Sequence, residues 1–142
     1  MTAEKLITKA YNYAQEKHKD QKDDNGYPYF NHPNQVAEIL KKVTLRDPEL
    51  ICAAYLHDVI EDCEVTYEEL REEFSEDIAD LVNEVSHEGK KDVKGFWFPR
   101  LKTQRGIMLK FADRLSNISR MESWDDERKA HYLKRSKFWK SE

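Results

Sequence analysis

The sequence predicts an all-α protein, and three observations carry that prediction. Charged residues make up 37% of the 142 residues, against roughly 25% in an average soluble protein. Glycine and proline number only four each, so few residues interrupt helices. Apolar residues recur at helical spacing through most of the chain, and no segment alternates with a period of two. We therefore expect one compact helical bundle over residues 1–142, with about six to eight helices.

The first two helices are predicted on either side of a turn-rich loop. Residues 3–18 carry an apolar face, and residues 20–32 contain Asn25-Gly26 and Pro28, which favour turns. Pro33 suits the first position of the second helix. Behind it the apolar residues form one stripe, made of Val36, Ala37, Ile39, Leu40 and Val43.

The third predicted helix is the most apolar part of the chain. Asp47 suits its N-cap and Pro48 its first helical position. Residues 50–56, LICAAYL, are apolar on every side, and such a helix is normally surrounded by others. We therefore expect this helix at the centre of the bundle.

Capping residues mark the later helices. Thr66 and Glu69 form a capping box for a fourth helix, and Ser75 can cap a fifth. Further helices are expected over about residues 105–121, with Ile107, Met108, Phe111, Leu115 and Ile118 in one stripe, and over 126–139. The polar residues 87–95 between them suit a loop.

Bulk properties exclude several classes of protein. The longest apolar run is seven residues, far short of the ~20 that a membrane span needs, and no apolar signal-peptide core is found. Cys52 and Cys63 lack CxxC spacing and fit a reducing cytosol. The net charge is −4, with no basic block. We expect a cytoplasmic protein that binds neither membrane nor nucleic acid, and we predict no particular oligomeric state.

The central helix ends in ionisable residues, the sequence HDVIED. Carboxylates are unfavourable at a helix C-terminus, where the partial charge is negative, and burying a charge without a partner is costly. His57 and Glu61 are spaced i, i+4, as are Asp58 and Asp62, so on one helix all four would lie on one face. A divalent metal bound by His57 and Asp58 would resolve the conflict. Alternatively, the helix ends near Val59 and the last two acids are solvated.

Two further residues could complete a metal site, which needs ligands from several elements. His32 directly precedes the proline of the second helix, where a short polar cap is commoner. Asp113 lies within an otherwise apolar helical stretch. The alternatives are a structural histidine, and an aspartate that pairs with Arg114 or is exposed.

Taken in order, four segments resemble the HD-domain metal-dependent phosphohydrolases, and most of all the small stand-alone alarmone (ppGpp) hydrolases of the RelA/SpoT type. The segments are YPYFNHPNQVAEIL, AAYLHDVIEDCEVTYEEL, FSEDIADLVNEVS and LKFADRLSNISRM. The resemblance implies one HD domain, the metal ligands His32, His57, Asp58 and Asp113, and Mn²⁺ as the most suitable ion. It implies that Glu61 and Asp62 orient or deprotonate the attacking water.

The resemblance also implies a small-molecule nucleotide substrate. Asn117 matches a substrate-contacting asparagine of the family, and Arg100 and Lys102 fall where basic phosphate contacts are frequent, although they could equally be solvated linker charges. Repulsion between the acidic site and a phosphate ester also leads us to expect Lys22 or Arg114 near the site. His18 matches a family histidine that supports the site or the fold.

One departure concerns base recognition. The family usually carries a basic pair, including an arginine that stacks on guanine, where this chain has Asp23 and Asp24. An aspartate cannot stack as a guanidinium does and repels phosphate, so Lys22 is left as a partial substitute. Phe96-Trp97-Phe98 could be a buried anchor or a stacking platform.

Three functions therefore remain open. The first is a ppGpp 3′-pyrophosphohydrolase, the second a 5′-nucleotidase or nucleotide triphosphohydrolase of the wider superfamily, and the third a nucleotide-sensing HD module without turnover. The two aspartates favour the second function, whereas the retained acidic pair argues against the third.

Overall fold

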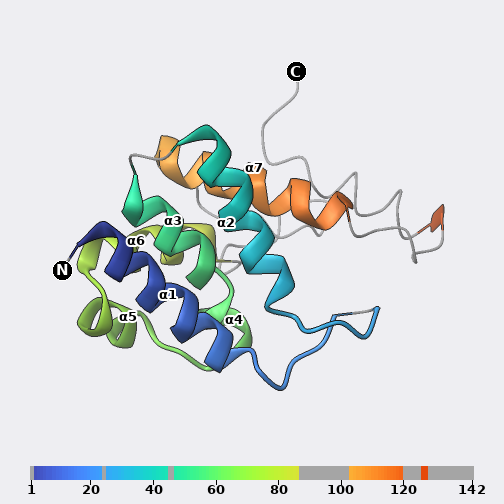
Figure 1. Ribbon diagram of the computed structural model, residues 1–142, viewed down its shortest axis with the longest axis horizontal. Coiled ribbons are helices and arrows are strands. Elements are labelled where there is room, and N and C mark those ends of the chain that lie inside the picture. Colours follow the sequence, from blue (N-terminus) through green and yellow to red (C-terminus); the bar gives the residue numbers. More distant parts are fainter. Residues whose placement is uncertain (1, 24, 45–46, 87–102, 120–125, 128–142) are drawn as a thin grey trace, which may run out of the picture.

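The computed structural model is an all-α bundle, as predicted. It describes residues 2–23, 25–44, 47–86, 103–119 and 126–127. Seven helices lie in these ranges (Figure 1): α1 Ala3–Lys17, α2 Asn31–Val43, α3 Pro48–Leu56, α4 Val59–Asp62, α5 Tyr67–Glu73, α6 Glu76–Val85 and α7 Gln104–Ser119. None of them is long and apolar enough to cross a membrane.

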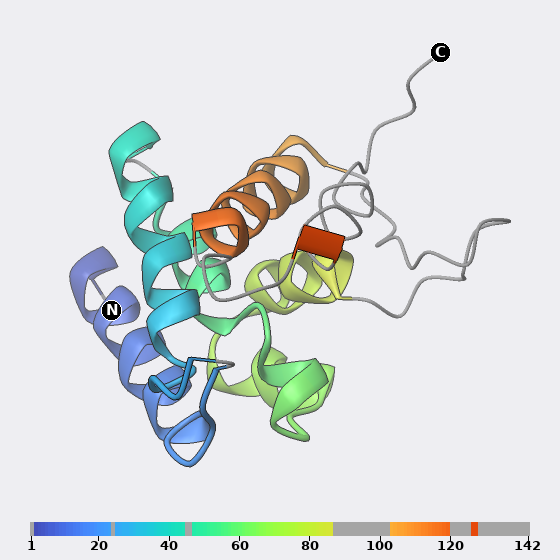
Figure 2. The ribbon, with the colours of Figure 1, turned by 90° about the vertical axis from the view of Figure 1, so that its right-hand side faces the viewer.

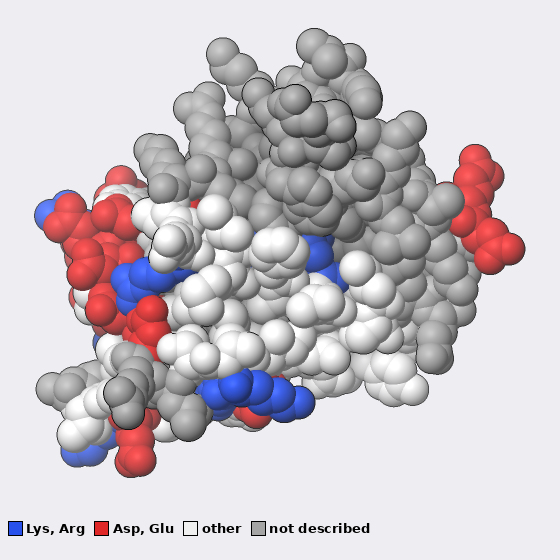
Figure 3. All heavy atoms as spheres, turned by 90° about the horizontal axis from the view of Figure 1, so that it is seen from above, with Lys and Arg blue, Asp and Glu red and all other residues white. Residues whose placement is uncertain are grey.

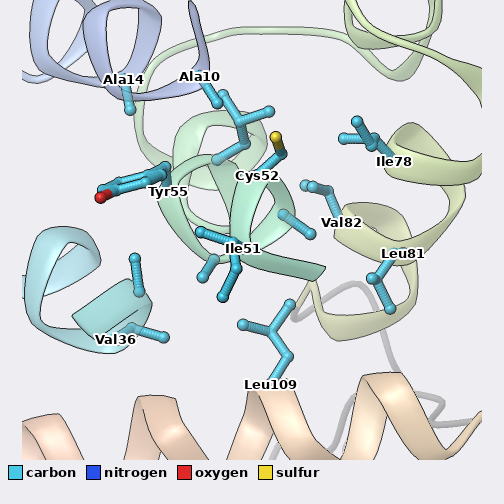
Figure 4. Packing of buried hydrophobic residues seen from close by; sticks show 14 of the residues in the cluster. Ala10, Ala14, Val36, Ile51, Cys52, Tyr55, Ile78, Leu81, Val82 and Leu109 are labelled. Carbon is cyan, nitrogen blue, oxygen red and sulfur yellow. The ribbon is translucent and has the colours of Figure 1, made fainter. Parts of the chain in front are cut away.

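Helix α3 is the centre of the bundle, as its sequence predicted. Every residue from Leu50 to Leu56 is buried. Helices α1, α2, α6 and α7 all contact α3, and Figure 4 shows their apolar side chains converging on it from four sides. Because so much apolar surface meets here, α3 is a fixed platform for the residues that follow it.

The predicted caps form. Asp47 accepts a hydrogen bond from Leu50 N at 3.2 Å, Thr66 from Glu69 N at 3.1 Å, and Ser75 from Ile78 N at 3.1 Å. Asp47 also pairs with Arg105, whose Nε donates to Asp47 Oδ2 at 2.8 Å. The same aspartate therefore caps α3 and anchors the start of α7.

Two helix boundaries differ from the prediction. Helix α2 begins at Asn31, two residues before Pro33, because Asn31 N and His32 N already bond to carbonyls three residues back. Helix α3 ends at Leu56, so His57 and Asp58 form a turn before the short α4, and one continuous face for HDVIED was wrong. The His57 side chain helps to end α3, since its Nδ1 lies 2.6 Å from the carbonyl oxygen of Ala54.

Helix α7 turns its charged residues inward. Lys110, Asp113 and Arg114 are buried, whereas the predicted stripe is largely exposed: Ile107, Phe111, Leu115 and Ile118 are 40–54% exposed. Helix α7 lies beside α2 in Figure 2, and Figure 3 shows mostly uncharged residues across the middle of the described surface on that side. The polar face of α7 therefore meets α2 and α3 at the functional site.

Candidate metal centre

Four side chains from three parts of the fold converge beside the end of α3. His32 comes from the first turn of α2, His57 and Asp58 from the turn between α3 and α4, and Asp113 from the middle of α7. Each offers one ligand atom, and these atoms all lie within 4.8 Å of one another. All four residues are at most 9% exposed. The structure thus brings together the four residues that the sequence analysis selected as metal ligands.

The carboxylate of Asp113 is the hub of the cluster. Its Oδ1 lies 2.8 Å from Nε2 of His32 and 3.2 Å from Nε2 of His57. Asp58 Oδ2 closes the group, at 3.1 Å from Nε2 of His57 and 3.6 Å from Nε2 of His32. The alternative in which Asp113 is exposed is therefore wrong.

The donor set fits a single divalent ion. Two ligands at about 2.1 Å from a common ion lie roughly 3 to 4.2 Å apart, close to the separations found here. Two imidazole nitrogens and two carboxylate oxygens are typical ligands of Mn²⁺, Fe²⁺ or Zn²⁺ rather than of Mg²⁺ or Ca²⁺. Both histidines also hold Nδ1 against an oxygen, His57 at the Ala54 carbonyl and His32 at Ser116 Oγ, 2.9 Å away. This leaves Nε2 of each ring facing the cluster.

Electrostatics show how strongly the cluster favours positive charge. Burial works against the charged forms, yet the histidines and Lys110 hold the pKa of Asp113 well below its usual range. For His57, burial lowers the pKa, but the neighbouring Asp58 and Asp113 outweigh it and raise the pKa well above the usual value. The raised pKa of His57 therefore offsets part of the negative charge of the two carboxylates.

Several residues that the sequence analysis did not assign to the site support the cluster. Tyr29 donates its hydroxyl hydrogen to Asp58 Oδ2 at 2.8 Å, and Lys110, only 2% exposed, lies 3.3 Å from Asp113 Oδ2. Ser116 contacts His32 and also Gln35, at 2.7 Å. The helical spacing of Lys110 and Ser116, each three residues from Asp113, was an available signal, since such neighbours share a helix face.

The acidic pair lies on α4, immediately beyond the cluster. Both Glu61 and Asp62 are exposed, and Asp62 N bonds to the carbonyl of Asp58 at 2.9 Å. Partial burial, together with the charges of Asp58 and Glu61, raises the pKa of Asp62 to about 6. A carboxylate in that range can accept a proton near neutral pH.

The residues predicted to contact substrate are placed less centrally. Asn117 is half-buried, one turn beyond Asp113 on α7, whereas Lys22 is exposed and forms an isolated β-bridge with Pro28. Arg114 is buried on the same helix. Arg100, Lys102, Asp24 and the Phe96-Trp97-Phe98 cluster lie outside the described residues.

Asp23 has a structural role in its loop. Its Oδ1 accepts hydrogen bonds from Asn25 N at 2.9 Å and Tyr27 N at 3.0 Å, and thereby closes the turn. The acidic residue at this position, where the family usually has a basic one, therefore stabilises the local backbone.

His18 lies next to the site but not in the cluster. It is buried, with Nδ1 2.8 Å from Gln21 Oε1 and 3.3 Å from Cys63 Sγ. Its ring lies 5.1 Å from that of Tyr29, the residue that contacts Asp58. The arrangement agrees with a supporting position.

Comparisons with known proteins agree with the geometry. The family model described as "HD domain" matches residues 10–93. A guanosine-3′,5′-bis(diphosphate) 3′-pyrophosphohydrolase of Aquifex aeolicus is 37% identical over 136 residues, which cover 90% of this chain but 19% of that protein. The MESH1 enzyme of Xenopus tropicalis, which carries the same activity in its name, is 35% identical over 152 residues, covering 96% of this chain and 82% of that protein.

A solved structure is similar over the same length. It is described as "A metazoan ortholog of SpoT hydrolyzes ppGpp and plays a role in starvation responses". It matches with a TM-score of 0.74 and 28% identity, over 92% of this chain and 81% of the other. The chain therefore spans about a fifth of the long Aquifex relative and most of the short relatives.

Proposed function

The chain belongs to the HD domain family, and on that premise we propose that it is a metal-dependent nucleotide phosphohydrolase that removes the 3′-pyrophosphate of ppGpp. One observation carries the proposal: two imidazole nitrogens and two carboxylate oxygens converge within 4.8 Å in a buried site, directly before an exposed acidic pair. The named activity of relatives that align over 90–96% of the chain supports the choice of substrate. We further propose that residues 1–142 act as one domain in the cytosol, where the free Cys52 and Cys63 fit.

We assign the metal ligands as His32, His57, Asp58 and Asp113, with Mn²⁺ as the physiological ion. A divalent ion held there would lower the pKa of the attacking water and polarise a phosphoryl oxygen. The protein's own part is to fix the four ligand atoms before the ion arrives. Helix α3 and the α2–α7 contact provide that rigidity, because they are packed into the core.

Asp62, with Glu61 beside it, is the proposed proton acceptor. Water attacks the phosphorus that carries the 3′ oxygen, and its proton passes to the Asp62 carboxylate. The bond between that phosphorus and the 3′ oxygen breaks, so pyrophosphate leaves and the 3′ oxygen takes up a proton. We assign Asn117, Arg100, Lys102 and Lys22 to substrate binding, where the basic side chains would offset the charge of the phosphates.

A second candidate function follows from Asp23. Because this carboxylate closes its own turn, the loop cannot present a guanidinium to a guanine base at this position. A 5′-nucleotidase or triphosphohydrolase acting on another nucleotide would use the same metal centre.

A product assay separates these functions. Purified protein with Mn²⁺ is incubated with ppGpp, nucleoside monophosphates and nucleoside triphosphates, and the products are resolved as pyrophosphate, phosphate or triphosphate. We expect pyrophosphate from ppGpp, and a loss of about 10³-fold or more in Asp113→Ala. Metal binding without turnover of any nucleotide would instead indicate a sensing module.

A further inference from the structure

The imidazole of His32 is held at both nitrogens, and the second contact leads away from the metal centre. Its Nδ1 lies 2.9 Å from Ser116 Oγ, and that oxygen lies 2.7 Å from Gln35 Oε1. Ser116 is fully buried on α7, and Gln35 is half-buried on α2. A chain of hydrogen bonds thus runs from His32 across the interface between these helices.

The direction of each hydrogen bond follows from counting protons. Gln35 Nε2 donates to Ser119 Oγ at 3.2 Å, which orients the amide so that its carbonyl oxygen faces Ser116. A carbonyl oxygen can only accept, so the single hydroxyl hydrogen of Ser116 is donated to Gln35. Ser116 Oγ must then accept from His32, and Nδ1 of His32 carries a hydrogen.

This direction decides which nitrogen of His32 is left to bind a metal ion. With Nδ1 held by Ser116, that atom is Nε2, which lies 2.8 Å from Asp113 Oδ1. At His57, Nδ1 is held instead by the backbone carbonyl of Ala54, near the end of α3. For His32 the orienting group comes from α7, three residues beyond the ligand Asp113.

We propose that Gln35 and Ser116 are positioning residues that fix the tautomer of His32 and thereby raise the affinity of the metal centre. The inference rests on the proposed metal site. Without Gln35, the Ser116 hydroxyl can rotate and donate to Nδ1 of His32. Nδ1 then accepts rather than donates, and the ring's only hydrogen lies on Nε2, the atom that has to bind the metal ion.

The test measures metal affinity without substrate, on the full chain stripped of metal by chelation. Mn²⁺ titrations by calorimetry should give a Kd about 10- to 100-fold weaker for Ser116→Ala, the range found when a group that orients a metal-binding histidine is lost. Gln35→Met, which keeps the length but removes the acceptor, should weaken binding by about 3- to 10-fold, the worth of one hydrogen bond. Gln35→Glu keeps an acceptor and should retain the wild-type Kd.

Ser86→Ala is the matched control. Ser86 is also a buried serine, but its hydroxyl donates to the carbonyl oxygen of Val82 at 3.0 Å and does not contact Gln35 or His32, so the Kd of this variant should stay within about twofold of wild type. Melting temperatures of the metal-free variants check that each is folded.

The second readout is the tautomer itself. In ¹⁵N spectra of the metal-free protein, Nδ1 of His32 should be protonated in wild type and shift toward the unprotonated position in Gln35→Met. Unchanged ¹⁵N shifts, or unchanged Kd values in both Ser116→Ala and Gln35→Met, would overturn the proposal. Because neither readout involves a nucleotide, the proposed role of Gln35 and Ser116 can be correct even if ppGpp proves not to be the substrate.

Discussion

Replacing Lys110 should expose the charge balance of the metal centre. Lys110 is 2% exposed, and its ammonium group lies 3.3 Å from Asp113 Oδ2, whereas the histidines contact Oδ1. In Lys110→Met the side chain keeps its approximate length but loses the positive charge. The metal-free protein then holds two buried carboxylates with less compensation.

The expected loss of folding stability in Lys110→Met is large for a single substitution. At an effective dielectric constant of 20, two unit charges 3.3 Å apart attract by about 5 kcal/mol. Measured losses on breaking a buried pair are about 3–5 kcal/mol, because one charge is left uncompensated. At roughly 3 °C per kcal/mol for a chain of this size, the metal-free variant should melt about 10–15 °C below wild type.

Manganese should reverse part of that loss. Metal at 100 times its Kd stabilises a protein by about 2.7 kcal/mol, and removal of the nearby Lys110 charge should make the variant bind the cation more tightly. The assay is thermal melting of both proteins with and without Mn²⁺. Lys41→Met is the control, since Lys41 pairs with Glu38 near the surface.

Two results would refute this reasoning. One is a metal-free Lys110→Met protein that melts within about 3 °C of wild type, less than the loss of a single buried hydrogen bond to a charged group. The other is a smaller rise in melting temperature with Mn²⁺ in the variant than in wild type. Either would mean that Lys110 does not balance the carboxylates.

Three further predictions concern residues around the centre. Tyr29→Phe removes the 2.8 Å hydrogen bond to Asp58 and should weaken Mn²⁺ binding about tenfold, measured by calorimetry. Asp62→Asn should abolish most hydrolysis yet stabilise the metal-free protein by at most about 1 kcal/mol at pH 7.5, after allowance for solvent screening. The pKa of Asp62 in the folded protein, about 6, lies above its ordinary value of 3.8, so the charged carboxylate lowers the stability of the folded protein above pH 6. The gain in melting temperature from Asp62→Asn should therefore fade as the pH falls toward 4. Asp23→Ala loses an acceptor for two backbone N–H groups and should lower the melting temperature by roughly 3 °C per bond lost, with kcat for the nucleotide unchanged.

Local sequence rules predicted the helices well, because the caps and the apolar core obey short-range physics. Asp47, Thr66 and Ser75 cap the helices expected of them, and the all-apolar segment 50–56 is the central helix. The break after Leu56 could not be predicted from periodicity. It depends on the His57 side chain bonding to a carbonyl of its own helix, which a pattern of apolar residues does not record.

The orientation of α7 depends on the site rather than on hydrophobicity. A stripe such as Ile107, Phe111 and Leu115 would normally face the core, but those side chains are 40%, 47% and 54% exposed. The opposite face carries Asp113 and Lys110. Both are buried because Asp113 contacts the two histidines and Lys110 pairs with Asp113. Sequence reasoning found the four cluster residues, since they follow a family motif. It missed Gln35, whose relation to His32 appears only when α2 and α7 are packed together.

The proposed reaction is the attack of water on phosphorus at the His/Asp cluster. Hydrolysis of ppGpp in ¹⁸O-labelled water with Mn²⁺, followed by mass spectrometry of the products, tests it most directly. We expect one ¹⁸O atom in the released pyrophosphate, none in the nucleotide's 3′ hydroxyl, and no labelled product from Asp113→Ala. Label in the nucleotide, or equal release by the Asp113→Ala variant, would contradict it.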